Sequence, residues 1–95
     1  MTELLPDEVT STTVGLAAKK VLHEREFQRQ RWSTDHDKQH STSDWVSILA
    51  VYLGKAAISS EPYCATNDSK SKELFKKRLI QLSAICIAAI ESMDS

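Results

Sequence analysis

Residues 79–90 constrain the fold of this chain most, because as a helix they are apolar on nearly every face. Only Gln81 and Ser83 interrupt this apolar segment. A helix that is apolar all round must be buried on all sides, and the remainder of so short a chain can hardly cover it. The segment therefore predicts association of subunits, in which each covered Leu or Ile contributes about 1.5–3 kcal/mol.

A row of apolar residues through this segment alternates spacings of four and three, as in a helix that packs lengthwise on another helix. The row consists of Phe75, Leu79, Leu82, Cys86, Ala89 and Met93. Helical periodicity recurs earlier in the chain, and the expected helices are residues 8–31, 42–58 and 69–93. We therefore expect an all-α, three-helix subunit, one domain over residues 1–95, that forms a helical-bundle homo-oligomer through its second and third helices.

The predicted helices have start signals, since Pro suits a first turn and hydroxyl or carboxylate groups cap free backbone amides. Ser41 and Asp44 predict a capping box for the second helix, and the third is expected to begin near Asp68 or Ser71. The first helix has an early and a later candidate set, which are Pro6, Asp7 and Glu8, or Ser11 and Thr12.

The second predicted helix is flanked by two expected loops and has an expected row of buried residues. The polar stretches 32–40 and 59–69 lack helical periodicity or contain turn-forming pairs, so we expect them to be loops. The expected buried row consists of Trp45, Ile48, Leu49, Tyr52, Leu53 and Ala56.

Composition and charge limit the partners of the chain. It is 41% hydrophobic and 26% charged, and its net charge of −1 gives no general attraction to duplex nucleic acid or acidic membranes. No apolar run has the length of a membrane span, and the first residues lack a signal-peptide stretch. We therefore expect a cytoplasmic protein without a membrane partner, and in that reducing compartment Cys64 and Cys86 are expected to be free thiols.

Two clusters of basic residues are candidate phosphate sites. Arg25, Arg29 and Trp32 share one helix face, so a nucleobase can stack on the indole while the guanidinium groups bind phosphate. Trp32 as a core anchor under the following loop is the alternative. The second cluster crowds the first turns of the third helix, where the dipole favours anions, and is either a phosphate site or a solvated basic face. Its members are Lys70, Lys72, Lys76, Lys77 and Arg78.

The loop at residues 35–40 has weak candidates for metal ligands, since His and Asp can coordinate Zn²⁺ or another transition metal. They are Asp35, His36, Asp37 and His40. No Cys or distant His completes such a shell in the sequence, so hydrogen bonds that fix the loop, or contact with a ligand, are the preferred interpretation. We expect no cofactor and no bound metal.

Three pieces of the chain share a pattern with a known family. The first is an Arg-rich helix end that leads to a Trp and a His-Asp loop, at Arg25, Gln28, Arg29, Gln30, Trp32, His36, Asp37 and His40. A Trp-led helix with a later Gly follows, at Trp45, Ile48, Leu49 and Gly54. Together with the last helix, at residues 79–84 and 88–94, this pattern resembles the MazG-like proteins of phages and bacteria, a family of all-α nucleotide pyrophosphohydrolases.

The chain departs from this family at the positions of the metal-binding acids. Active members place carboxylates on two helices to hold Mg²⁺, which prefers oxygen ligands, against the phosphates of a nucleotide. Aligned on the family glycine, this chain has no carboxylate there and instead carries Val51, Tyr52, Lys55, Arg78 and Gln81. The resemblance therefore implies nucleotide binding without cutting, with Lys55 and Arg78 on the phosphate; ordinary surface charges are the alternative.

We therefore expect non-catalytic binding or sequestration of a nucleotide or nucleotide-derived ligand, such as a cyclic immune-signalling nucleotide. In a phage-encoded protein this would act as a sponge against host defence, in the host cytoplasm. The predicted pocket lies between subunits and is built from Arg25, Arg29, Trp32, His36, Tyr52, Lys55 and Arg78. The alternatives are a structural or protein-binding helical module, and a residual nucleotide pyrophosphohydrolase that uses Asp35, Asp37 and Glu73.

Overall fold

The computed structural model describes residues 12–32, 39–66 and 68–94, except for the side chains of residues 62–66. These ranges contain three α-helices and no strand, namely α2 (Thr13–Arg31), α4 (Thr42–Thr66) and α5 (Ser69–Asp94). The prediction of an all-α chain with three helices is therefore confirmed for the described residues. The early start signal and the loop residues Asp35, His36 and Asp37 lie outside them.

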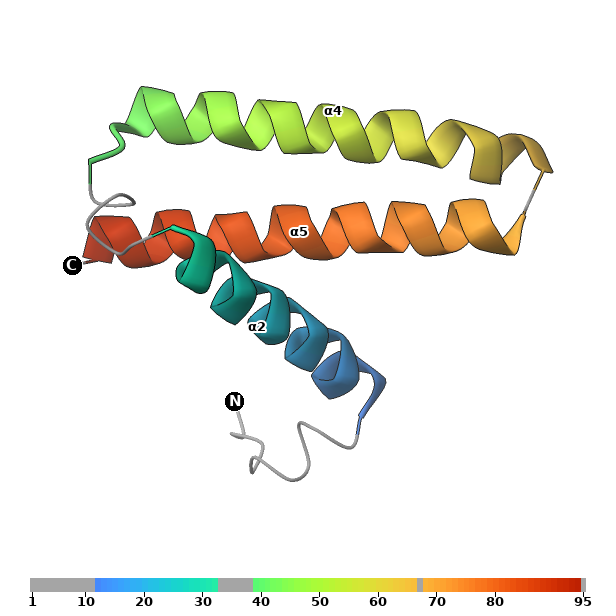
Figure 1. Ribbon diagram of the computed structural model, residues 1–95, viewed down its shortest axis with the longest axis horizontal. Coiled ribbons are helices and arrows are strands. Elements are labelled where there is room, and N and C mark those ends of the chain that lie inside the picture. The colour runs from blue at the N-terminus through green and yellow to red at the C-terminus, as the bar shows by residue number, and fades with distance from the viewer. Residues whose placement is uncertain (1–11, 33–38, 67, 95) are drawn as a thin grey trace, which may run out of the picture.

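Two of the helices form a hairpin and the third crosses it. Helices α4 and α5 lie side by side and antiparallel, and α2 crosses α5 in the carboxyl-terminal half of α5 (Figure 1). From this crossing the amino-terminal half of α2 diverges from the hairpin (Figure 1). Val14 and Leu22 of α2 are accordingly exposed, although both are apolar.

The core lies where α4 begins and α5 ends. Trp45 is only 6% exposed, and its indole Nε1 donates a hydrogen bond to Ser92 Oγ over 3.2 Å. A buried indole needs such an acceptor, because its N–H otherwise loses its hydrogen bond to water. The buried cluster around the ring consists of Trp45, Ile85, Ala88 and Ala89, with Ile48, Leu49 and Tyr52 packed against it.

The buried row predicted for α4 is largely correct. Its buried members are Trp45 and Ala56, and its half-buried members are Ile48, Leu49 and Tyr52. The prediction is wrong at Leu53, which is 58% exposed. Successive helix residues are offset by about 100°, so Leu53 turns away from the face that Tyr52 presents to α5.

The row predicted for α5 is not the face that α5 buries. Leu79, Cys86 and Met93 are exposed, and of that row only Ala89 is buried. Helix α5 is apolar on several sides, and the directions in which α4 and α2 cross it determine which side is buried. The buried side carries Ala84, Ile85, Ala88 and Ala89.

Rows of exposed apolar residues remain on both helices of the hairpin. Spacings of three, four and seven residues put each row on one side of its helix, and on α5 this side differs from the one that presents Gln81 and Glu91 to α2. On α4 the row lies roughly 100° or more around the helix from Ile48 and Tyr52, which line a cavity together with α2, so both rows lie on the face of the hairpin away from α2. This outer face consists of Val46, Ala50, Leu53, Ala57, Leu79, Cys86, Ile90 and Met93.

The observed helix starts distinguish between the candidate start signals. Thr12 has an extended backbone (φ −86°, ψ 161°), and its Oγ1 accepts a hydrogen bond from the Gly15 N–H at 2.9 Å. Helix α2 therefore begins at Thr13, so the predicted start at residue 8 is wrong and the later signal is confirmed. Asp68 caps α5, because its carboxylate accepts a hydrogen bond from the Ser71 N–H at 3.2 Å.

The predicted capping box of α4 is confirmed. The Asp44 N–H donates to Ser41 Oγ at 3.2 Å, and the Ser41 N–H donates to Asp44 Oδ2 at 2.8 Å. The hydrogen bonds from the Ser41 backbone and side chain lower the pKa of the Asp44 carboxyl. A lowered pKa in the folded state means that this stabilisation is present at neutral pH and is lost as the pH falls through that value.

Helix α4 is longer than predicted, and the expected loop at residues 59–69 is wrong, since the helix continues to Thr66. Ser59 Oγ donates to the Lys55 carbonyl at 2.8 Å, and Ser60 makes the same kind of bond to the preceding turn at 2.7 Å. Hydroxyl groups that bond back to the preceding turn allow Ser to remain within a helix.

Replacing Ser41 by Ala should lower the free energy of unfolding by about 1 kcal/mol, because the Asp44 N–H loses its capping acceptor. Chemical denaturation at pH 7 measures this change. Ser43→Ala is the matched control, since Ser43 is an exposed serine in the same turn, and it should have less effect. Equal effects of the two substitutions would contradict the capping role. The loss of unfolding free energy caused by Ser41→Ala should become smaller once the pH falls through the Asp44 pKa.

Candidate functional site

A cavity of about 240 Å³ lies where α2, α4 and α5 meet and is termed the aromatic cavity. Most of its wall is aromatic or apolar, with one guanidinium group and one amide among the lining side chains. It is lined by Arg25, Gln28, Trp32, His40, Trp45, Ile48, Tyr52, Ile85 and Ala88. The structure contains one chain, so the expected pocket between subunits stays a prediction.

The capping box of α4 also orients part of the cavity wall. His40 directly precedes the box, and its ring packs edge-on against Trp45, with 5.0 Å between ring centroids and 73° between the planes. His40 Nδ1 lies 3.9 Å from Asp44 Oδ2, which forms an ion pair when the imidazole is protonated. Tyr52 follows Trp45 by two helical turns and therefore lines the same side of α4.

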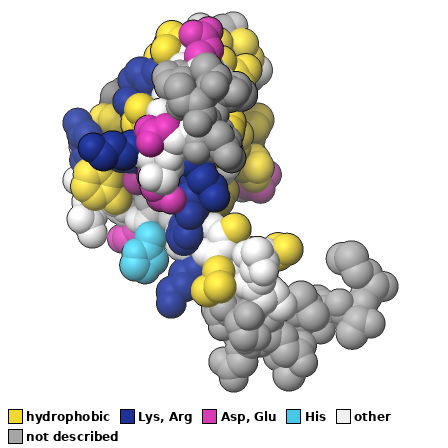
Figure 2. Space-filling model, turned by 90° about the vertical axis from the view of Figure 1, so that its right-hand side faces the viewer, with side chains coloured by type: hydrophobic (Ala, Val, Ile, Leu, Met, Phe, Trp, Pro, Cys, Tyr) yellow, Lys and Arg dark blue, Asp and Glu magenta, His cyan; other side chains and the backbone are white. Residues whose placement is uncertain are grey.

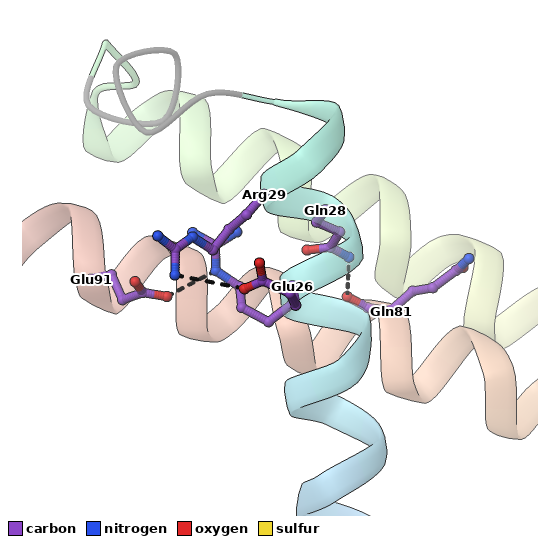
Figure 3. Close-up of polar contacts among 6 residues, drawn as sticks. Glu26, Gln28, Arg29, Gln81 and Glu91 are labelled. Atoms are coloured by element: carbon purple, nitrogen blue, oxygen red, sulfur yellow. Dashed lines mark hydrogen bonds and ion pairs between the residues drawn. The ribbon is translucent and has the colours of Figure 1, made fainter.

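Arg25 joins α2 to α5 beside the cavity. Its side chain is only 9% exposed, and its Nε donates to Glu91 Oε1 at 2.8 Å, while Glu91 is 49% exposed (Figure 3). A buried guanidinium requires such a compensating carboxylate, because removal from water is costly for an unpaired charge. The pair therefore fixes the position of Arg25 in the cavity wall.

Gln28 makes the second polar connection between these helices. The side chain is buried, and Nε2 donates to the Gln81 carbonyl at 3.4 Å (Figure 3). It also donates to Glu24 Oε2 at 3.1 Å. Both Arg25 and Gln28 are thus held by hydrogen bonds on the α2 side of the cavity. Preorganised polar groups of this kind give a pocket its ligand orientation.

The structure brings together three of the predicted site residues. Arg25, Trp32 and Tyr52 line the aromatic cavity, and the Lys55 ammonium lies above the Tyr52 ring, 4.7 Å from its centroid. Lys55 is therefore adjacent to the cavity without lining it. His36 lies outside the described residues.

Two other predicted site residues lie away from the cavity lining. Arg29 is exposed, and its Nη1 lies 3.8 Å from Glu26 Oε2 on the same helix (Figure 3). Arg78 Nη1 donates to Gln81 Oε1 at 3.0 Å, and its Nε is buried without a hydrogen-bond partner among the described residues. Neither arginine lines the aromatic cavity.

Several lining residues were not among the predicted ligand-binding residues. Gln28 and His40 belonged to the resemblance pattern, but nothing in their spacing showed that they face one cavity. Trp45 and Ile48 were predicted as core residues. They pack in the core and also line the cavity, because the cavity borders the core. The helical spacing of Trp45 and Tyr52 was the one sequence signal that could have joined these residues.

The described residues contain no group of three or more His, Cys, Asp and Glu side chains placed to hold a metal ion. Of the weak metal candidates, only His40 is described, and it contacts Trp45 and Asp44. None of the described helices is both long and apolar enough to span a membrane. Comparison of the chain with protein families, curated proteins and solved structures gives no match.

Replacing Glu91 by Gln should lower the free energy of unfolding by about 1 kcal/mol, because the buried Arg25 guanidinium loses a charged partner. Glu26→Gln is the matched control, since it removes the partner of the exposed Arg29 and should change stability by less than about 0.5 kcal/mol. Thermal and urea unfolding measure both values. Identical losses would show that burial of Arg25 adds nothing to the pair.

Proposed function

We propose that this protein binds a nucleotide or nucleotide-derived ligand without hydrolysing it, and that the base of the ligand occupies the aromatic cavity. The observation that carries the proposal is the convergence of Trp32, His40, Trp45 and Tyr52 on one cavity. Bases stack on aromatic side chains, and each such contact contributes about 1–3 kcal/mol. A volume of about 240 Å³ favours a base or nucleoside portion over a whole multiply phosphorylated ligand.

The polar groups of the cavity have the chemistry to orient a base. Gln28 carries an amide with donor and acceptor atoms, and Arg25 contributes a planar guanidinium that can also stack on a ring. The phosphate of the ligand would lie at the cavity edge next to Lys55, whose ammonium is held above Tyr52. Charge-assisted hydrogen bonds from Lys to phosphate need no bridging metal.

The proposal of binding without turnover depends on the MazG-like resemblance. At the acid positions of that family, α4 carries Val51, Tyr52 and Lys55, and none is a carboxylate. Hydrolysis of a phosphoanhydride by this family's route needs a metal to polarise the phosphate and activate water. With a basic residue beside the cavity instead, the ligand is held and not cut.

We further propose that the subunit associates with copies of itself through the outer face of α4 and α5. This face presents large apolar side chains, including Leu53, Leu79 and Ile90, along two neighbouring helices. Exposed apolar areas of this kind usually mark an interface. Ile85, which the sequence placed among the residues to be covered between subunits, is instead buried in the core of one subunit.

Binding is tested by calorimetry against linear and cyclic nucleotides in excess EDTA, where a complex should form because no metal bridges the phosphate. Trp32→Ala and Lys55→Ala should each weaken binding by about 1–3 kcal/mol, through lost stacking and a lost charged hydrogen bond. Arg29→Ala is the matched control and should bind as well as the unaltered protein, since Arg29 does not line the cavity.

Two outcomes would overturn this proposal. One is the absence of binding across the whole panel, which would leave a structural or protein-binding module as the better account. The other is release of pyrophosphate from nucleoside triphosphates with Mg²⁺, above a protein-free blank, which would establish the hydrolase alternative. Because Trp32→Ala removes a large side chain, circular dichroism must show that each variant is folded before its affinity is compared.

Self-association is tested by light scattering of Leu53→Lys. A charge on the outer face should dissociate the assembly into folded subunits, because the interface cannot hydrate the buried ammonium. Ile58→Lys is the matched control, since Ile58 is 70% exposed on another side of α4 and its substitution should leave the assembly intact. A monomeric unaltered protein at micromolar concentration would refute this part of the proposal.

A further inference from the structure

A second and larger hollow lies between α2 and α5, on the amino-terminal side of their crossing. Its volume is about 620 Å³, and it is termed the basic groove. Figure 2 looks toward the end of the molecule that carries the amino-terminal end of α5, where Lys and Arg side chains gather with apolar and acidic groups among them. The groove is lined by Leu16, Lys19, Lys20, His23, Glu24, Phe27, Glu73, Lys76, Lys77 and Ile80. It shares no residue with the aromatic cavity.

Lysines from both helices meet across this groove. Lys20 of α2 and Lys76 of α5 both line the groove, and the neighbouring Lys76 side chain lowers the pKa of Lys20. Glu73 opposes this in part and lies 3.9 Å from the Lys76 ammonium. Two like charges at short range are unfavourable unless an anion lies between them.

The residues that line the groove include more basic than acidic side chains, together with large apolar side chains. Lys19 and Lys77 add two further ammonium groups, whereas Glu24 and Glu73 are the two acids of the lining. Leu16, Phe27 and Ile80 provide apolar surface between the charges, and Leu16 and Phe27 are exposed. A ligand that satisfies both features carries an anionic group and an apolar or aromatic group.

We propose that the basic groove binds an amphiphilic phosphate monoester, with its phosphate between Lys20 and Lys76 and its organic group against Leu16, Phe27 and Ile80. A phosphate monoester carries up to two charges at neutral pH and therefore matches two facing ammonium groups. Lys binds phosphate as a point charge and needs no fixed geometry. A long polyanion fits less well, because the net charge of the chain is −1 and Glu24 and Glu73 interrupt the lysines.

The experiment is calorimetry with hexyl phosphate, adenosine monophosphate and inorganic phosphate at low salt. At least one monoester should bind about tenfold more tightly than inorganic phosphate, because only the monoesters have a group for the apolar surface of the groove. Tighter binding of hexyl phosphate would identify an aliphatic, lipid-like source, and tighter binding of adenosine monophosphate a nucleotide source. Failure of both monoesters to exceed inorganic phosphate would overturn the proposal.

Substitutions of groove residues test whether the monoester binds in the basic groove. Lys20→Gln and Lys76→Gln should each weaken binding of the preferred monoester about tenfold, because each removes one of the two ammonium groups proposed to hold the phosphate. Lys72→Gln is the matched control, because Lys72 is an exposed lysine of α5 outside the groove lining, and it should have no such effect.

The aromatic cavity is separated from the groove by Trp32→Ala, which should leave binding of hexyl phosphate unchanged, because this ligand has no base to stack on the indole. Loss of binding in Trp32→Ala with full binding in Lys20→Gln and Lys76→Gln would assign the ligand to the aromatic cavity and overturn the proposal for the groove. The experiments can therefore support or refute the proposals for the two sites independently of each other.

Discussion

The burial of Trp45 between the start of α4 and the end of α5 is the contact on which the rest of the described structure depends. The ring fills the space beside Ile85, Ala88 and Ala89, and its N–H is satisfied by Ser92. An aromatic ring of this size contributes more buried apolar area than any other side chain in the core. It also forms a wall of the aromatic cavity, so core packing and cavity shape are set by the same residue.

Helix α2 is attached to the hairpin mainly by polar contacts near its carboxyl-terminal end. Arg25 pairs with Glu91 and Gln28 bonds to the Gln81 carbonyl, both on α5. These contacts hold α2 at a crossing angle, after which its amino-terminal half diverges from the hairpin (Figure 1). The crossing therefore creates two hollows of different chemistry, one aromatic and one basic, on either side of the contact.

Helix α5 has two apolar faces with different surroundings in this fold. One face is covered within the subunit by α4 and α2, and the other lies in the outer face together with Leu53 of α4. Our proposal of self-association accounts for the second face, because apolar area that one short chain cannot cover is removed from water by another copy. The aromatic cavity lies on the α2 side of the hairpin, so a copy on the outer face would leave it open to ligand.

The sequence by itself determined the features that act within one or two helical turns. Ser41 and Asp44 identified the start of α4, and the spacing of Trp45 and Ala56 identified its buried side. The extension of α4 through Ser59 was missed, since a Ser-rich stretch fits either a loop or a helix whose hydroxyls bond back to its carbonyls.

Only the tertiary structure decided which apolar face of α5 is buried, and which candidate site residues come together. Helix α5 has apolar residues on nearly every side, so periodicity alone favoured the row through Leu79, whereas the crossing of α4 and α2 buried the side of Ile85. In the same way Arg25 and Arg29 share a sequence pattern, but only Arg25 points into the contact with α5. The reason is that helix crossing is set by contacts between segments far apart in the chain, which no local pattern encodes.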